Sequence, residues 1–191
     1  MFTGWRPILK LVPGVFGMLL AVGAAAEEQK AFTSGEYGYR LRLPRSWNVS
    51  VSGNGIPTIY NYDPKDALPQ GLFPEHGADI LLIPFAVVQP ATKGHTLTEW
   101  IHSNTAHGYS NVVVKQVSSP NGSKHRPSDV VEVRADFRRA PDDEELQRTV
   151  CYYFTLHGMK FRLMLEYWKD DPRSAYFESV LDAVFRSLES P

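Results

Sequence analysis

The sequence predicts a single exported α+β domain, in which an amphipathic helix packs on a mainly antiparallel sheet. Every second residue from Phe161 to Tyr167 is strongly apolar, which is the two-residue period of a strand with one buried face. Asp170, Asp171 and Pro172 then favour a helix start, since aspartate is a good N-cap and proline suits the first helical position. One arc of the following helix is apolar and is expected to face the sheet: Phe177, Val180, Leu181, Val184, Phe185 and Leu188.

The N-terminal residues are typical of a secretory signal peptide. Arg6 and Lys10 precede an apolar run over residues 11–26, which ends in three alanines. The run contains a proline and glycines and is shorter than the ~20 apolar residues of a membrane-spanning helix. We therefore expect cleavage after Ala26, a periplasmic or extracellular location, and no transmembrane helix in the mature chain.

Composition narrows the function classes. The chain has 20 Lys and Arg and 21 Asp and Glu, and removal of residues 1–26 takes away two basic residues, so the mature net charge is −3. This charge gives no indication of a nucleic-acid partner. The only cysteine, Cys151, excludes an intramolecular disulfide, and a mature chain of this length is expected to form one domain with a sufficient core.

The first half of the mature chain predicts three strands and a long loop. Residues 27–31 are polar and are expected to form a flexible lead-in. Strands are predicted at 37–43, 48–51 and 58–62, with a tight turn at Pro44 that places Trp47 beneath it. Residues 63–79 contain three prolines and two glycines, and a loop of this length in a compact domain is often functional.

The second half predicts a helix between further strands. Residues 80–88 form a continuous apolar run that predicts a buried strand, with Pro84 favouring an edge or a bulge. Thr96 and Glu99 fit a capping box that begins a helix. Further strands are expected at 112–117, 130–138 and 147–156.

A hairpin follows, and its register can be derived. A two-residue turn at His157 and Gly158 pairs Leu156 with Met159 and fixes the later pairs. The core face then holds Phe154 with Phe161, Tyr152 with Leu163, and Val150 with Leu165. The other face holds Tyr153 with Arg162, Cys151 with Met164, and Thr149 with Glu166, and we expect Glu132, Arg134 and Asp136 to join it.

Two ends of the chain carry a resemblance to a known family. An early aromatic strand ending in Pro44 and Trp47, and a late strand through Tyr167 leading into a helix that ends at residues 185–188, resemble the PsbP-like superfamily. The resemblance covers residues 32–188. It implies a single α/β/α sandwich around a mainly antiparallel sheet and a non-enzymatic binding or assembly role.

The sequence assigns no catalytic, cofactor-binding or metal-ligating residue. Glu75, His76 and Asp79 could contribute to a metal site, but zinc-type spacing is lacking. Cys151 on a strand is best explained as a structural thiol. We therefore expect an exported non-enzymatic binding or assembly domain, with a small hydrolase or metal-dependent enzyme of the cell envelope as the alternative.

A partner, either another envelope protein or a small ligand, is expected to bind near the 63–79 loop, because loops on a rigid sheet often carry recognition. The predicted contact residues are Tyr62, Leu72, Phe73, His76 and Asp79. The alternative for Phe73 is that it folds inward and closes the end of the core, as large apolar side chains are mostly buried.

Overall fold

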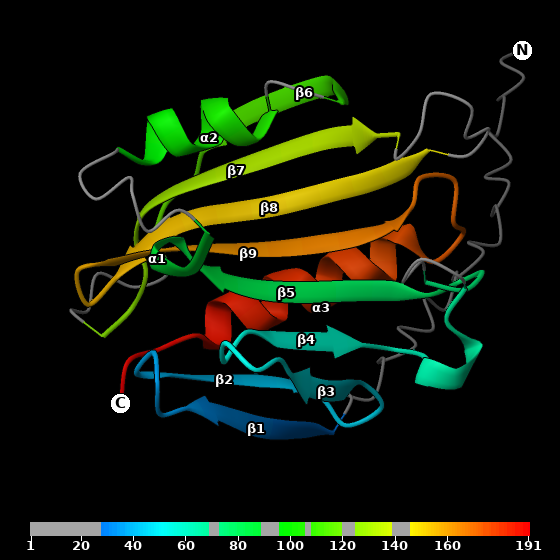
Figure 1. Ribbon diagram of the computed structural model, residues 1–191, viewed down its shortest axis with the longest axis horizontal. Coiled ribbons are helices and arrows are strands. Elements are labelled where there is room, and N and C mark those ends of the chain that lie inside the picture. The colour runs from blue at the N-terminus through cyan, green and yellow to red at the C-terminus, as the bar shows by residue number, and fades with distance from the viewer. Residues whose placement is uncertain (1–27, 69–72, 89–95, 106–107, 120–124, 139–145) are drawn as a thin grey trace, which may run out of the picture.

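The computed structural model describes residues 28–68, 73–88, 96–105, 108–119, 125–138 and 146–191. A seven-stranded antiparallel sheet in the order β3-β4-β5-β9-β8-β7-β6 forms its centre, and β1 and β2 form a separate two-stranded sheet (Figure 1). The strands are β1 (Gln29–Ser34), β2 (Tyr39–Pro44), β3 (Asn48–Val51), β4 (Pro57–Tyr60), β5 (Ala78–Pro84), β6 (Tyr109–Gln116), β7 (Ser128–Phe137), β8 (Gln147–Leu156) and β9 (Met159–Trp168). The helices are η1 (Pro64–Asp66), α1 (Phe85–Val88), α2 (Leu97–Thr105) and α3 (Ser174–Ser187).

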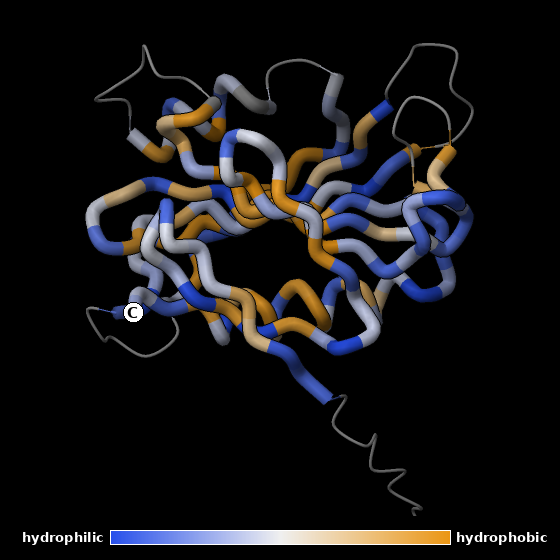
Figure 2. The backbone as a smooth tube through the Cα atoms, turned by 60° about the horizontal axis from the view of Figure 1, so that its bottom comes forward, coloured by the Kyte–Doolittle hydropathy of each residue, from blue (hydrophilic) through white to orange (hydrophobic). Residues whose placement is uncertain are grey.

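The sheet is covered on both faces, so the α+β class predicted from the sequence is confirmed. Helix α3 contacts β9 on one face and β2 at its side, whereas α1 and α2 lie on the opposite face (Figure 1). Each face has its own cluster of buried apolar side chains, and hydrophobic segments concentrate along the strands between the layers (Figure 2). The larger cluster, on the α3 side, includes Trp47, which lies under the turn closed by its N–H donating to the Pro44 carbonyl at 3.1 Å.

The hairpin register and the buried face of the C-terminal helix agree with the prediction, but the start of the helix does not. Leu156 pairs with Met159, and the pairs of Phe154 with Phe161 and of Val150 with Leu165 follow as expected. The helix does not begin at Pro172, because its first helical residue is Ser174. The predicted apolar arc is buried along its whole length: Phe177, Val180, Leu181, Val184, Phe185 and Leu188.

Helix α2 begins with the predicted capping box. The Glu99 carboxylate accepts a hydrogen bond from the Thr96 backbone N–H at 2.6 Å, and the Thr96 hydroxyl oxygen accepts one from the Glu99 N–H at 3.2 Å. These reciprocal bonds satisfy two N–H groups that a helix start leaves without partners.

Three expectations about elements are wrong. The flexible lead-in at 27–31 is instead part of a strand from residue 29, since β1 pairs with β2 along its whole length. The apolar run at 80–88 is not one strand, because β5 ends at Pro84 and α1 begins at Phe85. Pro84 therefore marks the end of an internal strand rather than a sheet edge or a bulge.

The third wrong expectation is that Glu132 and Arg134 of β7 lie on the face of the sheet away from α3. Glu132 lies opposite Tyr152 and Arg134 lies opposite Val150, so these charged residues share the α3 face. Arg134 there donates to Glu178 of α3 at 2.7 Å. The valine side of β7 consequently packs with Cys151 and Tyr153 under α2, in the second core cluster.

Candidate functional site

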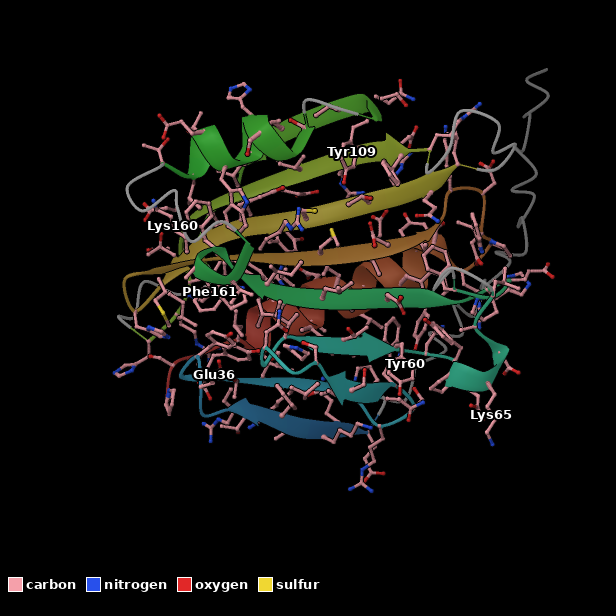
Figure 3. The ribbon with its side chains drawn as sticks, in the orientation of Figure 1. Glu36, Tyr60, Lys65, Tyr109, Lys160 and Phe161 are labelled. Atoms are coloured by element: carbon pink, nitrogen blue, oxygen red, sulfur yellow. The ribbon has the colours of Figure 1, made fainter. Side chains whose placement is uncertain are left out.

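A cleft of about 570 Å³ opens at the end of the sheet where β9 stops. Figure 3 shows this end of the molecule, which is marked by Tyr60 at the end of β4 and Lys65 in η1. The cleft combines apolar and polar side chains from segments that are far apart in the sequence. The lining residues are Leu68, Glu75, His76, Leu146, Trp168, Lys169, Asp170, Asp171 and Pro172.

An aromatic pair supports the cleft from the inside. The ring of Phe73 lies 5.0 Å from that of Trp168 in an edge-to-face arrangement, and Phe73 is buried. Such pairs contribute beyond the area that they bury. Phe73 therefore points inward, which is the alternative to partner contact that the sequence analysis gave. Trp168 forms the aromatic surface of the cleft.

A histidine and a buried aspartate form the main polar feature of the cleft. His76 Nδ1 lies 3.0 Å from Asp171 Oδ2, and the other Asp171 oxygen accepts a hydrogen bond from the Arg173 backbone N–H at 2.7 Å. The Asp171 side chain is 2% exposed and that of His76 is 45% exposed. A buried carboxylate held at two points fixes the orientation of the imidazole, whose Nε2 lies 3.6 Å from Glu75 Oε1.

The backbone at His76 is held in an uncommon conformation. Its φ of 61° lies in the left-handed region, which costs energy for a residue with a β-carbon. Asn61, the residue after β4, stabilises this turn, because its amide donates to the His76 carbonyl at 3.3 Å and accepts from the Ala78 N–H at 2.8 Å. The turn therefore presents His76 in one orientation, as is common at functional sites.

The rim of the cleft is acidic. Lys169 directs its amino group to Asp136, at 3.0 Å, and Arg148 contacts the same carboxylate at 2.6 Å. Burial would raise the pKa of Asp136, but hydrogen bonds from Asn111, Lys169 and Arg148 outweigh it and lower the pKa. Because the buried Asp136 carboxylate neutralises the charge of Lys169, the carboxylates of Glu75 and Asp170 give the rim its negative charge.

A second polar group lies on the sheet beside this region. Tyr62 makes a side-chain hydrogen bond to Asp79, and Asp79 lies directly opposite Glu166 on β9. Burial raises the pKa of Asp79 to about 6, the hydrogen bond from Tyr62 opposes this increase, and the charge of Glu166 adds to it. Neither Tyr62 nor Asp79 is among the residues that line the cleft.

The five residues predicted from the sequence thus have different positions. His76 lies in the cleft, Tyr62 and Asp79 contact each other nearby, and Phe73 is buried. Leu72 lies outside the described residues. The sequence did not single out Trp168 or Asp171 as site residues. Trp168 could have been noticed, because it is a large aromatic residue on the polar side of β9.

The described residues contain no group of three or more His, Cys, Asp or Glu side chains arranged to hold a metal ion. His76 Nε2 lies 3.6 Å from Glu75 Oε1, whereas Asp79 makes its side-chain hydrogen bond with Tyr62. Cys151 is buried, and this burial raises the pKa of its thiol to about 12, which favours the protonated, unreactive form. In the ranges that the structure covers, no helix has the length and apolar character needed to cross a membrane.

Comparison with known proteins gives matches in structure. No protein-family model matches the chain, and no curated protein matches its sequence. The crystal structure of LpqN, involved in cell envelope biogenesis of Mycobacterium tuberculosis, matches with a TM-score of 0.52 and 11% identity, over 86% of this chain and 91% of LpqN. The solution structure of cyanobacterial PsbP (CyanoP) from Synechocystis sp. PCC 6803 matches with a TM-score of 0.43 and 12% identity, over 88% of this chain and 96% of that one.

At such low identity, the match to LpqN bears on the fold alone. The described architecture agrees with the arrangement of helices and antiparallel sheet that the resemblance implies. The predicted fold, helices on the faces of a mainly antiparallel sheet, is confirmed by the described architecture, and LpqN shares it.

Proposed function

We propose that this chain is an exported, non-enzymatic binding or assembly domain of the cell envelope, and that its partner or ligand docks in the cleft at the end of the sheet. The observation that carries this proposal is the combination of apolar walls with a fixed polar group. Leu68 is 44% exposed and lies in the same cleft as Trp168 and as His76, whose ring is oriented by Asp171. Apolar contact area with a few convergent polar groups is characteristic of binding sites.

Export is supported by the N-terminal sequence. Basic residues, a short apolar run and a small-residue end precede the folded domain, as in secretory signal peptides. LpqN, which shares the fold, is a protein involved in cell envelope biogenesis. The same compartment for this chain is part of the proposal.

Each residue of the site has a specific proposed role. Leu68 and Trp168 provide apolar contact, and His76 provides a hydrogen-bonding group with a fixed direction. Tyr62 and Asp79 extend the contact surface onto the sheet, and Leu72 stays one of the predicted contact residues. Phe73 supports Trp168 from within and makes no direct contact with the partner.

The test uses two exposed residues that are matched in character. Leu68→Glu places a charge on the apolar wall, whereas Val51→Glu makes a similar change on β3, where Val51 is 54% exposed. We expect Leu68→Glu to abolish co-purification of the partner from the source organism's envelope at unchanged melting temperature, and Val51→Glu to preserve it. Equal co-purification by the two variants would contradict the placement of the site.

The His76–Asp171 pair favours a small hydrolase of the cell envelope as a second candidate. A carboxylate-oriented imidazole can act as a general base toward a hydroxyl group or a water molecule. Under this alternative, His76→Gln would remove the turnover of a small-molecule ester or amide, whereas a binding domain would show no turnover in either form. Hydrolysis assays on the purified mature chain, with and without this substitution, separate the two candidates.

A further inference from the structure

Strand β6 is the most exposed strand of the central sheet. It stands at one end of the strand order and is hydrogen-bonded to β7 within the sheet. Seven of its eight residues are exposed, and only Tyr109 is partly covered. An edge strand of this length offers its outer backbone N–H and C=O groups to another strand.

The side chains of β6 are unusual for an exposed strand. Val112, Val113 and Val114 are 40%, 59% and 55% exposed, and they account for three of the six large apolar side chains exposed in the described part of the chain. Valine favours strand conformation, so this segment is already shaped for further pairing. Solvent-exposed edges usually carry several charges or a proline, but the only charged residue here is Lys115.

The geometry of β6 divides it into two parts. A bulge places Asn111 and Val112 opposite a single residue of β7, and Asn111 has a φ of 51°. From Val113 to Gln116 the strand pairs regularly with β7. Any additional strand is therefore expected to pair with the regular part.

We infer that β6 pairs with β6 of a second copy of this chain, antiparallel and centred on Val114. In this arrangement Val114 lies opposite Val114 of the second copy, which joins two β-branched side chains directly across the strands. Val113 lies opposite Lys115, and Val112 lies opposite Gln116. The pairing is centred in the regular part of the strand, only its outermost pair reaches the bulge residue Val112, and the two sheets join into one.

The charge pattern favours a second copy. A two-fold axis through Val114 pairs each lysine with a valine, so no like charges lie directly opposite. The lysine stem can pack on the valine while its amino group remains in water. The contact is a single pair of strands, which places it among small and reversible interfaces rather than permanent ones.

Cysteine crosslinking tests this inference in the mature full-length chain. Val114→Cys places two thiols directly opposite, with Cβ atoms about 4.5–5.5 Å apart, and oxidation is expected to give a disulfide-linked dimer. Val51→Cys, on the exposed edge strand β3, is the matched control and should give little dimer. The native Cys151 is buried and does not compete.

Sedimentation analysis of the unmodified chain provides the second readout. We expect a reversible dimer in the high micromolar range, and Val114→Lys should weaken the self-association about tenfold by placing like charges opposite each other. Circular dichroism verifies that both variants fold. Equal crosslinking at positions 114 and 51, a monomer at all concentrations, or a dimer that Val114→Lys leaves unchanged would overturn the inference.

Discussion

Asp79 couples stability to pH at the level of a single residue. Its pKa rises from 3.8 to about 6 in the folded state, mainly because of burial, so the folded protein holds this proton more tightly than the unfolded chain. The stabilisation that comes from this tighter proton binding is fully present below pH 3.8 and is lost as the pH rises through about 6. At neutral pH the charged carboxylate therefore opposes folding.

Asp79→Asn is expected to remove this pH dependence. Asparagine stays neutral and can still accept the hydrogen bond from Tyr62. Relative to the variant, the parent should lose about 2 kcal/mol of unfolding free energy between pH 4 and pH 7, as measured by urea denaturation. Asp66→Asn, at an exposed position in η1, is the control and should follow the parent at each pH. A constant difference between parent and Asp79→Asn would show that Asp79 titrates as an exposed aspartate.

Asp171 is expected to be the main structural residue of the cleft. Asp171→Ala removes the acceptor for the His76 ring and for the Arg173 N–H, and should cost about 1–3 kcal/mol of unfolding free energy. Asp170→Ala changes the exposed neighbour and should have little effect. Comparable denaturation midpoints for the two variants would contradict the role of the buried carboxylate.

The sequence showed only part of what Asp171 does. Its position before a proline and an amphipathic segment predicted the N-cap of α3, whereas the N-cap is Arg173 and the Asp171 carboxylate accepts a hydrogen bond from the Arg173 N–H. The contact with His76 joins residues that are 95 positions apart, and no local pattern encodes such a pair. The contact residues expected near the 63–79 loop stay a prediction, and they did not include the His76–Asp171 pair.

At the level of elements, helix α3 holds the larger core together. Val184→Asp would place an unpaired carboxylate against the sheet, where Val184 is fully buried. The cost of several kcal/mol is comparable to the total stability of ~5–15 kcal/mol, so the variant should not fold. Ala183→Asp, one residue earlier and exposed, should fold normally. Near-ultraviolet circular dichroism checks both, and a folded Val184→Asp protein would refute the packing of α3.

Elements with strong local periodicity could be predicted from the sequence. The β8–β9 register follows from a two-residue turn, and the buried face of α3 follows from the 3.6-residue period. Strand β1 lacks this signal because its residues are mostly polar, and only its pairing with β2 makes it a strand. The boundary between β5 and α1 lies inside a continuous apolar run, where strand and helix cannot be distinguished by period.

The face of β7 was mispredicted for a different reason. In an antiparallel pair the register decides which side chains share a face, and a shift of one residue reverses all of them. Nine residues separate β7 from β8 in the sequence, so the length of the connection does not set this register, in contrast to the two-residue turn of the β8–β9 hairpin. The charged residues Glu132 and Arg134 consequently lie beside α3, where Arg134 pairs with Glu178.

At the level of the whole molecule, the proposed export predicts a defined mature N-terminus. Expression of the full chain in a bacterial host and mass spectrometry of the secreted or periplasmic product should show a protein that begins at Glu27. Ala24→Arg together with Ala26→Arg should block processing, because signal peptidase sites need small residues. An unprocessed chain from the unsubstituted sequence would contradict export with cleavage after Ala26.

The two proposed surfaces lie on different parts of the molecule. The cleft is lined by residues at and after the end of β9. Strand β6 is a lateral edge of the same sheet (Figure 1). Pairing through β6 involves no residue that lines the cleft. A dimer could therefore present two clefts, and substitutions on one surface should leave the other intact.

Site-specific photo-crosslinking tests the central claim, that the cleft is the binding site, most directly. A photoreactive amino acid at position 68, in the cleft wall, is compared in the source organism's envelope with the same amino acid at position 51, which is also exposed. The account predicts one discrete crosslinked product at position 68. This product should be lost when the same chain also carries His76→Ala, and position 51 should give no equivalent product. Crosslinking of the same product at both positions, or at position 51 alone, would contradict the claim.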